Sequence, residues 1–251
     1  MIFNYTPLNY GGWVLGDEAR EGVNIKKLGL MNECESEIWN NAVPYQDKRD
    51  DPGQAEIVTY SAIKLLEYIP GKREIVVPSA ILHDIGWYGN DPQLWDKLME
   101  KHKGSLKSLD SEAIRRPHQN RGLLLAGRVL EKSRYFENHL YESWLEIADI
   151  IGDHDTKQLP TTENGKIMRA ADLMWRMSYP HAERYFPNCS PEEVVKNIND
   201  STFSLSDEKG LRPLEKRIAR IELANTLKFK FKDEVGEEIS REFSKEFSLF
   251  G

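Results

Sequence analysis

Apolar residues recur every three or four positions along most of the chain, which is the spacing of helices with one buried face. The stretch QAEIVTYSAIKLLEYI, residues 54–69, predicts one such helix. A second is predicted over about 73–85, where Pro78 marks a first turn or a kink and Gly86 a stop. Further helices are predicted over 91–102, 111–131, 137–152, 164–179, 191–198, 211–231 and 233–247.

The first 30 or so residues are broken by glycines and rich in aromatic residues, which predicts a loop or a short hairpin packed on the body. The chain shows no internal repeat and no low-complexity linker, so we expect one all-α domain over 1–251. Its core is expected over about 45–180, with an N-terminal extension over 1–44 and C-terminal helices over 181–251.

The composition limits the partners and the metal ligands that the chain can have. The 251 residues are 39% hydrophobic, enough for a substantial core, but the apolar stretches are too short to cross a bilayer. The first residues lack the features of a signal peptide, so we expect a cytoplasmic chain with no membrane partner. Two cysteines are too few for a cysteine-rich metal site, which leaves histidine and carboxylate as ligands. A net charge of -7 argues against coating of nucleic acid but permits a local basic patch for a phosphorylated small molecule.

Polar residues interrupt or end several apolar helices. These residues are His83 and Asp84 in AILHDIGWYG, His118 in RRPHQNRG, His154 in IIGDHD and Asp172 in IMRAADLMW. A buried carboxylate needs a cation or a network of donors. Taken singly, each residue is more often a cap or a satisfied core group. Taken together, imidazoles and carboxylates at the ends of several helices are typical of a divalent metal site in a helical protein.

Three other histidines, His102, His139 and His181, lie in polar surroundings, and we interpret them as structural or exposed to solvent.

The ordered set LHDIG, PHQNRG, GDHD and AADL resembles the HD-domain superfamily of metal-dependent phosphohydrolases over about residues 45–180. The resemblance implies an all-α, HD-domain-like helical bundle, here with a short irregular N-terminal segment and a C-terminal helical extension. It implies metal ligands at His83, Asp84, His118, His154 and Asp172. The family's first histidine is replaced, since the corresponding stretch is DDPGQAEIV with Gln54 in that place.

Members with two additional histidines have dinuclear sites, and the resemblance implies one or two divalent ions here, among Mn, Mg, Fe, Ni or Co. By that analogy Asp84 bridges both ions. The remaining positions divide into His118 and His154 for the second ion, and Gln54, His83 and Asp172 for the first. An amide oxygen is a harder and weaker donor than imidazole, so Gln54 favours Mg or Mn.

The resemblance implies hydrolysis of a phosphate ester or anhydride of a small, nucleotide-like molecule by a metal-activated water. Cations near the predicted ligands could neutralise the phosphate, unless they only form solvated helix faces; they are Arg115, Arg116, Arg121 and Lys157. Asp153 and Asp155 flank His154 and either orient the site or cap the loop.

Two alternatives stay open at this point. Some members with both additional histidines resemble di-iron oxygenases, although Gln54 in place of an iron-binding histidine counts against that chemistry. The other alternative is that Gln54 marks a decayed site in a ligand-binding or regulatory domain, although the other five positions all keep residues that can ligate a metal. The predicted partner is a phosphorylated small-molecule substrate, and the sequence leaves open whether the chain forms a homodimer.

Overall fold

The computed structural model of the chain describes residues 4–46, 51–88, 111–155, 159–203, 205 and 210–232. Within these ranges every regular element is a helix and none is a strand, which confirms the predicted all-α class. The helices predicted over 91–102 and 233–247 lie outside the described residues. No helix in the described part is both long and apolar enough to span a bilayer.

The helices fall close to their predicted positions. The α-helices are α1 (Asp17–Arg20), α2 (Val23–Leu28), α3 (Glu33–Ala42), α4 (Gln54–Leu66), α5 (Arg73–Leu82), α7 (Ser111–Lys132), α8 (Tyr135–Asn138), α9 (Tyr141–Asp153), α10 (Glu163–Met174), α11 (Tyr179–Tyr185), α12 (Pro191–Ile198) and α13 (Pro213–Phe231). Shorter turns are η1 (Val43–Tyr45), η2 (Ile85–Trp87), η4 (Trp175–Met177) and the π-helical η5 (Asn199–Phe203).

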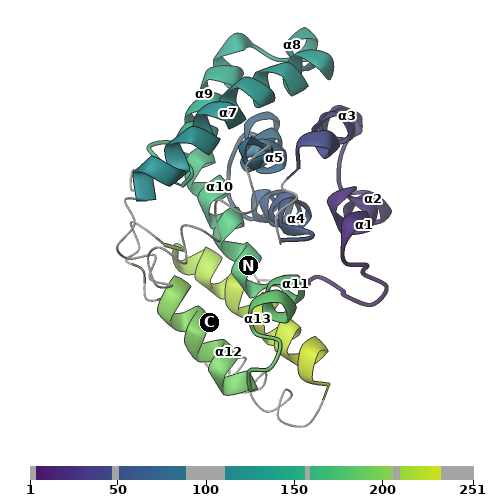
Figure 1. The fold of residues 1–251 in the computed structure, drawn as a ribbon, viewed down its shortest axis with the longest axis vertical. Coiled ribbons are helices and arrows are strands. Elements are labelled where there is room, and N and C mark those ends of the chain that lie inside the picture. Colours follow the sequence, from purple (N-terminus) through teal and green to yellow (C-terminus); the bar gives the residue numbers. More distant parts are fainter. Residues whose placement is uncertain are drawn as a thin grey trace.

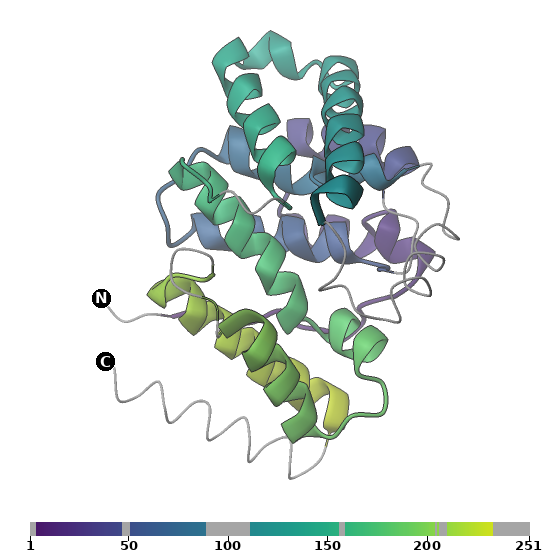
Figure 2. The ribbon, with the colours of Figure 1, turned by 60° about the vertical axis from the view of Figure 1, so that its left-hand side comes forward.

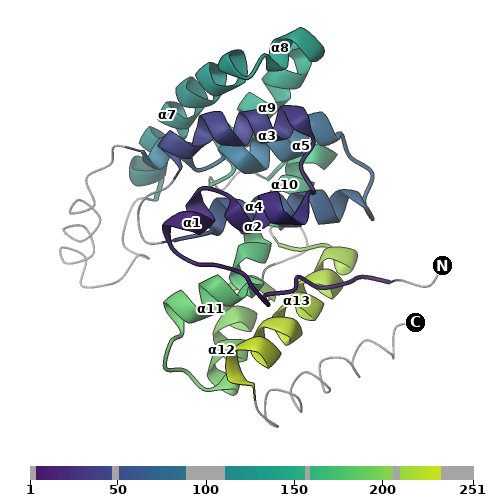
Figure 3. The same ribbon diagram turned by 90° about the vertical axis from the view of Figure 1, so that its right-hand side faces the viewer.

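The helices are arranged around α4, α5 and α10. Figure 1 shows α7, α8 and α9 at one end of the molecule and α11, α12 and α13 at the other, with α10 running between the two groups. Helices α7 and α9 lie side by side (Figure 2). On the flank seen in Figure 3, α3 packs on α5, while α1 and α2 pack on α4.

The hydrophobic core includes residues from Leu8 to Leu227. Helix α4 lies at its centre and packs on both α5 and α10, so most of the side chains of α4 are buried. The N-terminal segment joins the same core through α13, where Glu222 accepts hydrogen bonds from the Tyr5 hydroxyl and from the Leu8 main-chain N–H. Helix α13 is thereby tied to residues near the N-terminus.

Four local predictions are wrong, and the fourth, at Gly86, is described with helix α5 below. Asp17–Arg20 and Val23–Leu28 form α1 and α2 instead of a loop or hairpin, while 4–16 lack a helix. The helix predicted over 137–152 is divided, because residues 139 and 140 are extended between α8 and α9. The helix predicted over 164–179 ends at α10, because Ser178 is extended and caps α11.

Helix α5 accommodates a proline in its interior. Proline has no N–H and therefore leaves the carbonyl four residues earlier without its helical donor. For Pro78 that carbonyl belongs to Glu74, and the hydroxyl of Tyr135 donates to it at 2.7 Å. The helix thus continues through Pro78 to Leu82. The stop predicted at Gly86 is wrong, since α5 ends before it and Gly86 lies in η2.

Candidate metal centre

The predicted His and Asp ligands come from the ends and faces of four helices. His83 and Asp84 follow the last residue of α5, and His154 follows the last residue of α9. His118 lies in α7, and Asp172 lies in α10. Helix α5 packs on α9 and α10, while α7 packs on η2 and α9. This packing brings the side chains together at one place.

Two of the imidazoles are oriented by the same local device. His83 Nδ1 lies 2.9 Å from the carbonyl oxygen of Ala80, and His154 Nδ1 lies 2.7 Å from that of Ile151. A carbonyl oxygen can only accept, so Nδ1 carries the hydrogen in each ring. In the neutral imidazole, Nε2 then offers a lone pair, and in both residues Nε2 faces Asp84. The helix ends therefore present two rings in the tautomer that ligates a metal through Nε2.

Asp84 lies at the centre of the cluster. Its Oδ1 is 3.1 Å from His154 Nε2 and accepts a hydrogen bond from Trp87 Nε1 at 3.1 Å. The same oxygen is 3.8 Å from His118 Nε2, and Oδ2 is 3.4 Å from His83 Nε2. Burial alone would raise the pKa of Asp84, but the imidazoles of His83 and His154 outweigh it and hold the pKa well below its usual range. Asp84 is therefore a carboxylate.

The carboxylates make the centre attractive to positive charge. Burial lowers the pKa of His83, yet Asp84 and Asp172 more than compensate and raise it to about 9. The pKa of His154 is also raised: burial again opposes, and Asp84 and Asp155 outweigh it. Protons and metal ions compete for the same imidazole nitrogens, so the field that retains a proton here also favours a bound cation.

His118 is held from both sides. Its ring stacks on Trp87 with centroids 3.9 Å apart and 14° between the planes. On the main-chain side, Gly86 packs so closely that a Cβ there would lie 1.8 Å from the carbonyl oxygen of His118 and 2.6 Å from the nitrogen of Gly122. Glycine is therefore required where η2 meets α7. His118 Nε2 reaches to 3.5 Å from Asp155 Oδ2.

Four residues form the tightest group of possible ligands. In the described part of the chain, one donor atom from each of Asp84, His118, His154 and Asp155 lies within 4.8 Å of the others. Two imidazole nitrogens with two carboxylate oxygens suit divalent ions such as Mn, Fe, Co, Ni or Zn. The Asp155 side chain is 29% exposed, while those of the other three are 10% exposed or less. The group is thus buried but opens toward solvent at Asp155.

His83 and Asp172 lie on the other side of Asp84. His83 Nε2 is 3.6 Å from Asp172 Oδ1. Burial raises the pKa of Asp172, partly offset by the imidazole of His83. Gln54, the first residue of α4, lines a small cavity together with Asp84. Its Oε1 is buried and has no hydrogen-bond partner within the described residues. The sequence-predicted set is therefore adjacent to Asp84, and ligation by Gln54 stays a prediction.

The predicted phosphate-binding cations are placed differently. Arg121 Nη1 donates to the carbonyl oxygens of Gly86 at 3.2 Å and Tyr88 at 2.9 Å, so it fastens η2 to α7. Arg116 is exposed and lies 4.0 Å from Asp153. The side chain of Arg115 and the whole of Lys157 lie outside the described residues, as does His102 among the other histidines. Arg121 thus has a structural role, and a phosphate-binding role for these residues remains a prediction.

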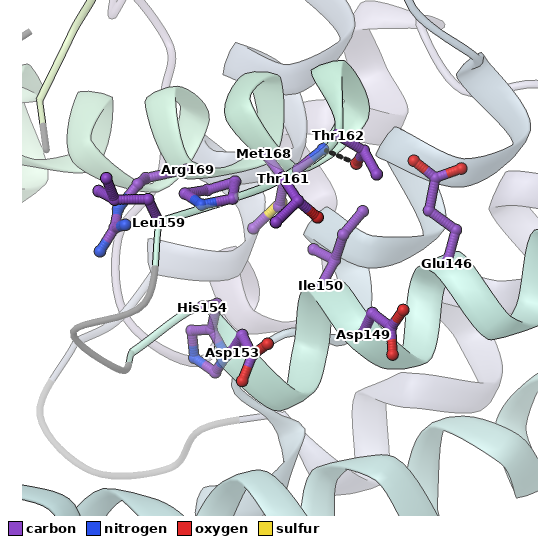
Figure 4. A pocket seen from close by; sticks show the side chains of 12 residues that line it. Glu146, Asp149, Ile150, Asp153, His154, Leu159, Thr161, Thr162, Met168 and Arg169 are labelled. Carbon is purple, nitrogen blue, oxygen red and sulfur yellow. Dashed lines mark hydrogen bonds between the residues drawn. The ribbon is translucent and has the colours of Figure 1, made fainter. Parts of the chain in front are cut away.

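A different arginine was missed by the sequence reasoning. Arg169 lies in α10, three residues before Asp172, and is partly buried. Burial lowers its pKa, while the charges of Asp172 and Asp155 act in the opposite direction. Together with His154 it lines a pocket beside the cluster (Figure 4). The signal was available, since residues three apart share a helix face and Asp172 was already a candidate.

The remaining described histidines agree with the structural interpretation. His181 packs against the rings of Trp175 and Tyr185, and His139 lies 4.4 Å from the ring of Tyr135.

Comparisons with protein-family models, with curated proteins and with solved structures find no match to this chain. The findings are an all-helical protein with a buried His/Asp cluster that could hold a metal ion, without a family assignment.

Proposed function

We propose that the chain is a metal-dependent phosphohydrolase of the HD type, which hydrolyses a phosphate ester or anhydride of a small molecule. The observation that carries the proposal is the convergence of Asp84, His118, His154 and Asp155 on one point in the described structure. The residues come from separate segments of the chain, so their convergence depends on the fold and not on local sequence.

The donor set fits a divalent ion. Gln54 Oε1 is buried and has no hydrogen-bond partner among the described residues, and His83 Nε2 faces the carboxylates of Asp84 and Asp172 at 3.4 and 3.6 Å. Leaving a group such as Gln54 Oε1 unsatisfied costs about 1–3 kcal/mol unless a ligand completes it. Gln54 and His83 both lie beside Asp84, whose ionised carboxylate supplies negative charge. A first position with Gln54, His83 and Asp172 would then adjoin a second one with His118, His154 and Asp155.

A divalent ion held there would activate water near neutral pH and neutralise charge on a phosphoryl group. The protein's own groups would have separate roles. Asp84 lies between the two proposed metal positions and would contribute its carboxylate to both. Asp155, the most exposed member, offers Oδ2 to the ion, and we assign its other carboxylate oxygen to accept a proton from the attacking water. Arg169 offers a guanidinium to the phosphoryl oxygens from the adjacent pocket.

The test is phosphate release by purified protein that has been stripped with a chelator and reloaded with one ion at a time from Mg, Mn, Fe, Co and Ni. A panel of phosphomonoesters and nucleotides serves as substrates under strict anaerobiosis. We expect release with at least one ion and a loss of about 100-fold or more in the Asp84→Asn and His118→Ala variants. His139→Gln, outside the cluster, is the matched control and should retain activity.

Absence of phosphate release with every ion would contradict the proposal. Iron content together with O2 consumption would assign the site to oxygenase chemistry instead. Absence of metal binding, with His83→Ala leaving the stability unchanged, would indicate a ligand-binding domain.

A further inference from the structure

A pocket opens beside the candidate metal centre, between α9, residues 159–162 and α10 (Figure 4). His154 belongs both to the four-residue cluster and to the pocket wall, so the two are continuous. The described lining consists of Glu146, Asp149, Ile150, Asp153, His154, Leu159, Pro160, Thr161, Thr162, Gly165, Met168 and Arg169.

The charges in this wall are separated. Glu146, Asp149 and Asp153 occupy positions three and four apart on α9, which places them along one face of the helix. Figure 4 shows the three carboxylates following α9, with Arg169 on the opposite side of the pocket. Among the described lining residues Arg169 is the only arginine or lysine. One side of the pocket therefore suits a cation and the other an anion.

The carboxylate farthest from the cluster is firmly positioned. Glu146 Oε1 accepts a hydrogen bond at 2.9 Å from Asn164 Nδ2, and Asn164 Oδ1 in turn accepts from the main-chain N–H of Lys72 at 2.8 Å. Asp149, one turn closer to the cluster, is exposed. The two carboxylates thus offer a prepared site whose negative charge has solvent access.

The guanidinium of Arg169 is the part of the pocket that suits the anionic end of a ligand. That guanidinium lies within the field of Asp172 and Asp155, so it is near the place where the proposed reaction occurs. Between the two charged sides the wall is aliphatic, with Ile150 and Met168 buried. No Phe, Tyr or Trp is among the described lining residues, which favours a short aliphatic ligand over a stacked nucleobase.

We infer that the substrate is a zwitterionic phosphate monoester, with its phosphoryl group at Arg169 and an ammonium group at Glu146 and Asp149, joined by a short aliphatic chain. The inference rests on the proposed function for the reaction at the phosphoryl end, and it makes the α9 carboxylates the determinants of specificity. Hydrolysis of such an ester breaks the bond between phosphorus and the leaving oxygen, adds water as OH to phosphorus and H to the oxygen, and releases an amino alcohol and inorganic phosphate.

Binding is tested with two probes that water does not hydrolyse, 4-aminobutylphosphonate and butylphosphonate. They have the same chain and phosphoryl group and differ in the ammonium group alone. Isothermal titration calorimetry on Mn-loaded protein should show about tenfold tighter binding of the amino compound, the effect of two partly exposed charge pairs. The Glu146→Gln/Asp149→Asn double variant should lose this preference while its affinity for butylphosphonate stays unchanged.

Two further variants sharpen the result. Glu142→Gln removes the same charge from the same helix outside the pocket and should keep the preference. Arg169→Gln should lower the affinity for both probes by about the same factor. Equal affinity for the two probes, a preference that survives in the double variant, or no binding of either probe would overturn the inference.

The proposed function is tested separately, by measuring phosphate release from 3-aminopropyl phosphate and from propyl phosphate. Equal release from both would support hydrolysis and overturn the assignment of the pocket. A binding preference without release from either would support the assignment of the pocket and contradict hydrolysis.

Discussion

His154 Nε2 lies 3.1 Å from Asp84 Oδ1, although 70 positions separate the two residues along the chain. One residue follows the end of α9 and the other follows the end of α5, and those two helices pack against each other. The contact between α5 and α9 therefore sets the geometry of the centre. A change in this packing would change the distance between the imidazole of His154 and the carboxylate of Asp84, which both proposed metal positions share.

Removing the charge of Asp84 should abolish stabilisation by metal. A ligand present at 100 times its Kd raises the free energy of unfolding by about 2.7 kcal/mol. Wild-type protein should thus unfold at a higher temperature when saturated with Mn, whereas Asp84→Asn should not respond. Asp200→Asn, an exposed position far along the chain in η5, is the control for loss of one charge and should respond like the wild type. An equal Mn response in Asp84→Asn would remove Asp84 from the site.

Gly86 should tolerate no side chain. A Cβ at this position would meet the main chain of α7 at 1.8 Å from the His118 oxygen, so Gly86→Ala must push η2 and His118 apart. We expect a loss of about 3 kcal/mol or more in chemical denaturation, together with weaker Mn binding.

The matched control lies in α7 itself. A Cβ at Gly127 would meet Trp144 at an ordinary 3.7 Å, so Gly127→Ala should stabilise the helix by about 0.5–1 kcal/mol. If Gly86→Ala and Gly127→Ala change the free energy of unfolding by similar amounts, the contact between η2 and α7 does not exclude a side chain at Gly86.

Gln54→His should change the metal preference. The amide oxygen is a hard donor, and imidazole raises affinity for ions such as Ni or Co over Mg and Mn. Competition between Mn and Ni, followed by calorimetry, should show the variant shifted toward Ni by about tenfold or more. An unchanged preference would mean that position 54 does not contact the ion.

Glu222 should make stability depend on pH. Burial raises its pKa to about 7 from the 4.5 of an ordinary glutamate. The folded protein thus holds the proton more tightly than the unfolded chain does. This contribution to stability is fully present below pH 4.5 and is lost as pH rises through about 7, and the rise in pKa corresponds to about 3 kcal/mol.

A neutral substitute removes that dependence. Glu222→Gln retains an acceptor for the Leu8 N–H, so its free energy of unfolding should fall less than that of the wild type between pH 5 and pH 8. The free energies of unfolding are measured by urea denaturation across this range. If they change with pH in the same way in the two proteins, the raised pKa of Glu222 is contradicted.

The helices could be predicted from the sequence where apolar periodicity was strong. Helix α12 has the predicted bounds because Ser190 and Glu193 form a capping box before a clear amphipathic pattern. The division between α8 and α9 carried no such signal, since neither glycine nor proline lies at residues 139–140. There the tertiary packing decides where the chain turns.

The candidate site could be predicted as a set of residue types but not as a geometry. His83, Asp84 and His154 stood out because polar groups end apolar helices. The sequence predicts Asp155 as a group that flanks His154, whereas the structure places its carboxylate beside His118 Nε2. Arg169 was overlooked because a basic residue within a helix usually lies on a solvated face, and its burial follows from the contact of α10 with the rest of the core.

The most direct test of the central claim is anomalous diffraction from crystals of the chain grown with Mn. We expect a peak between Asp84, His118, His154 and Asp155 at coordination distances of about 2.0–2.3 Å, and its disappearance in Asp84→Asn. A saturated crystal without a peak among these residues, or with the same peak in the variant, would contradict it.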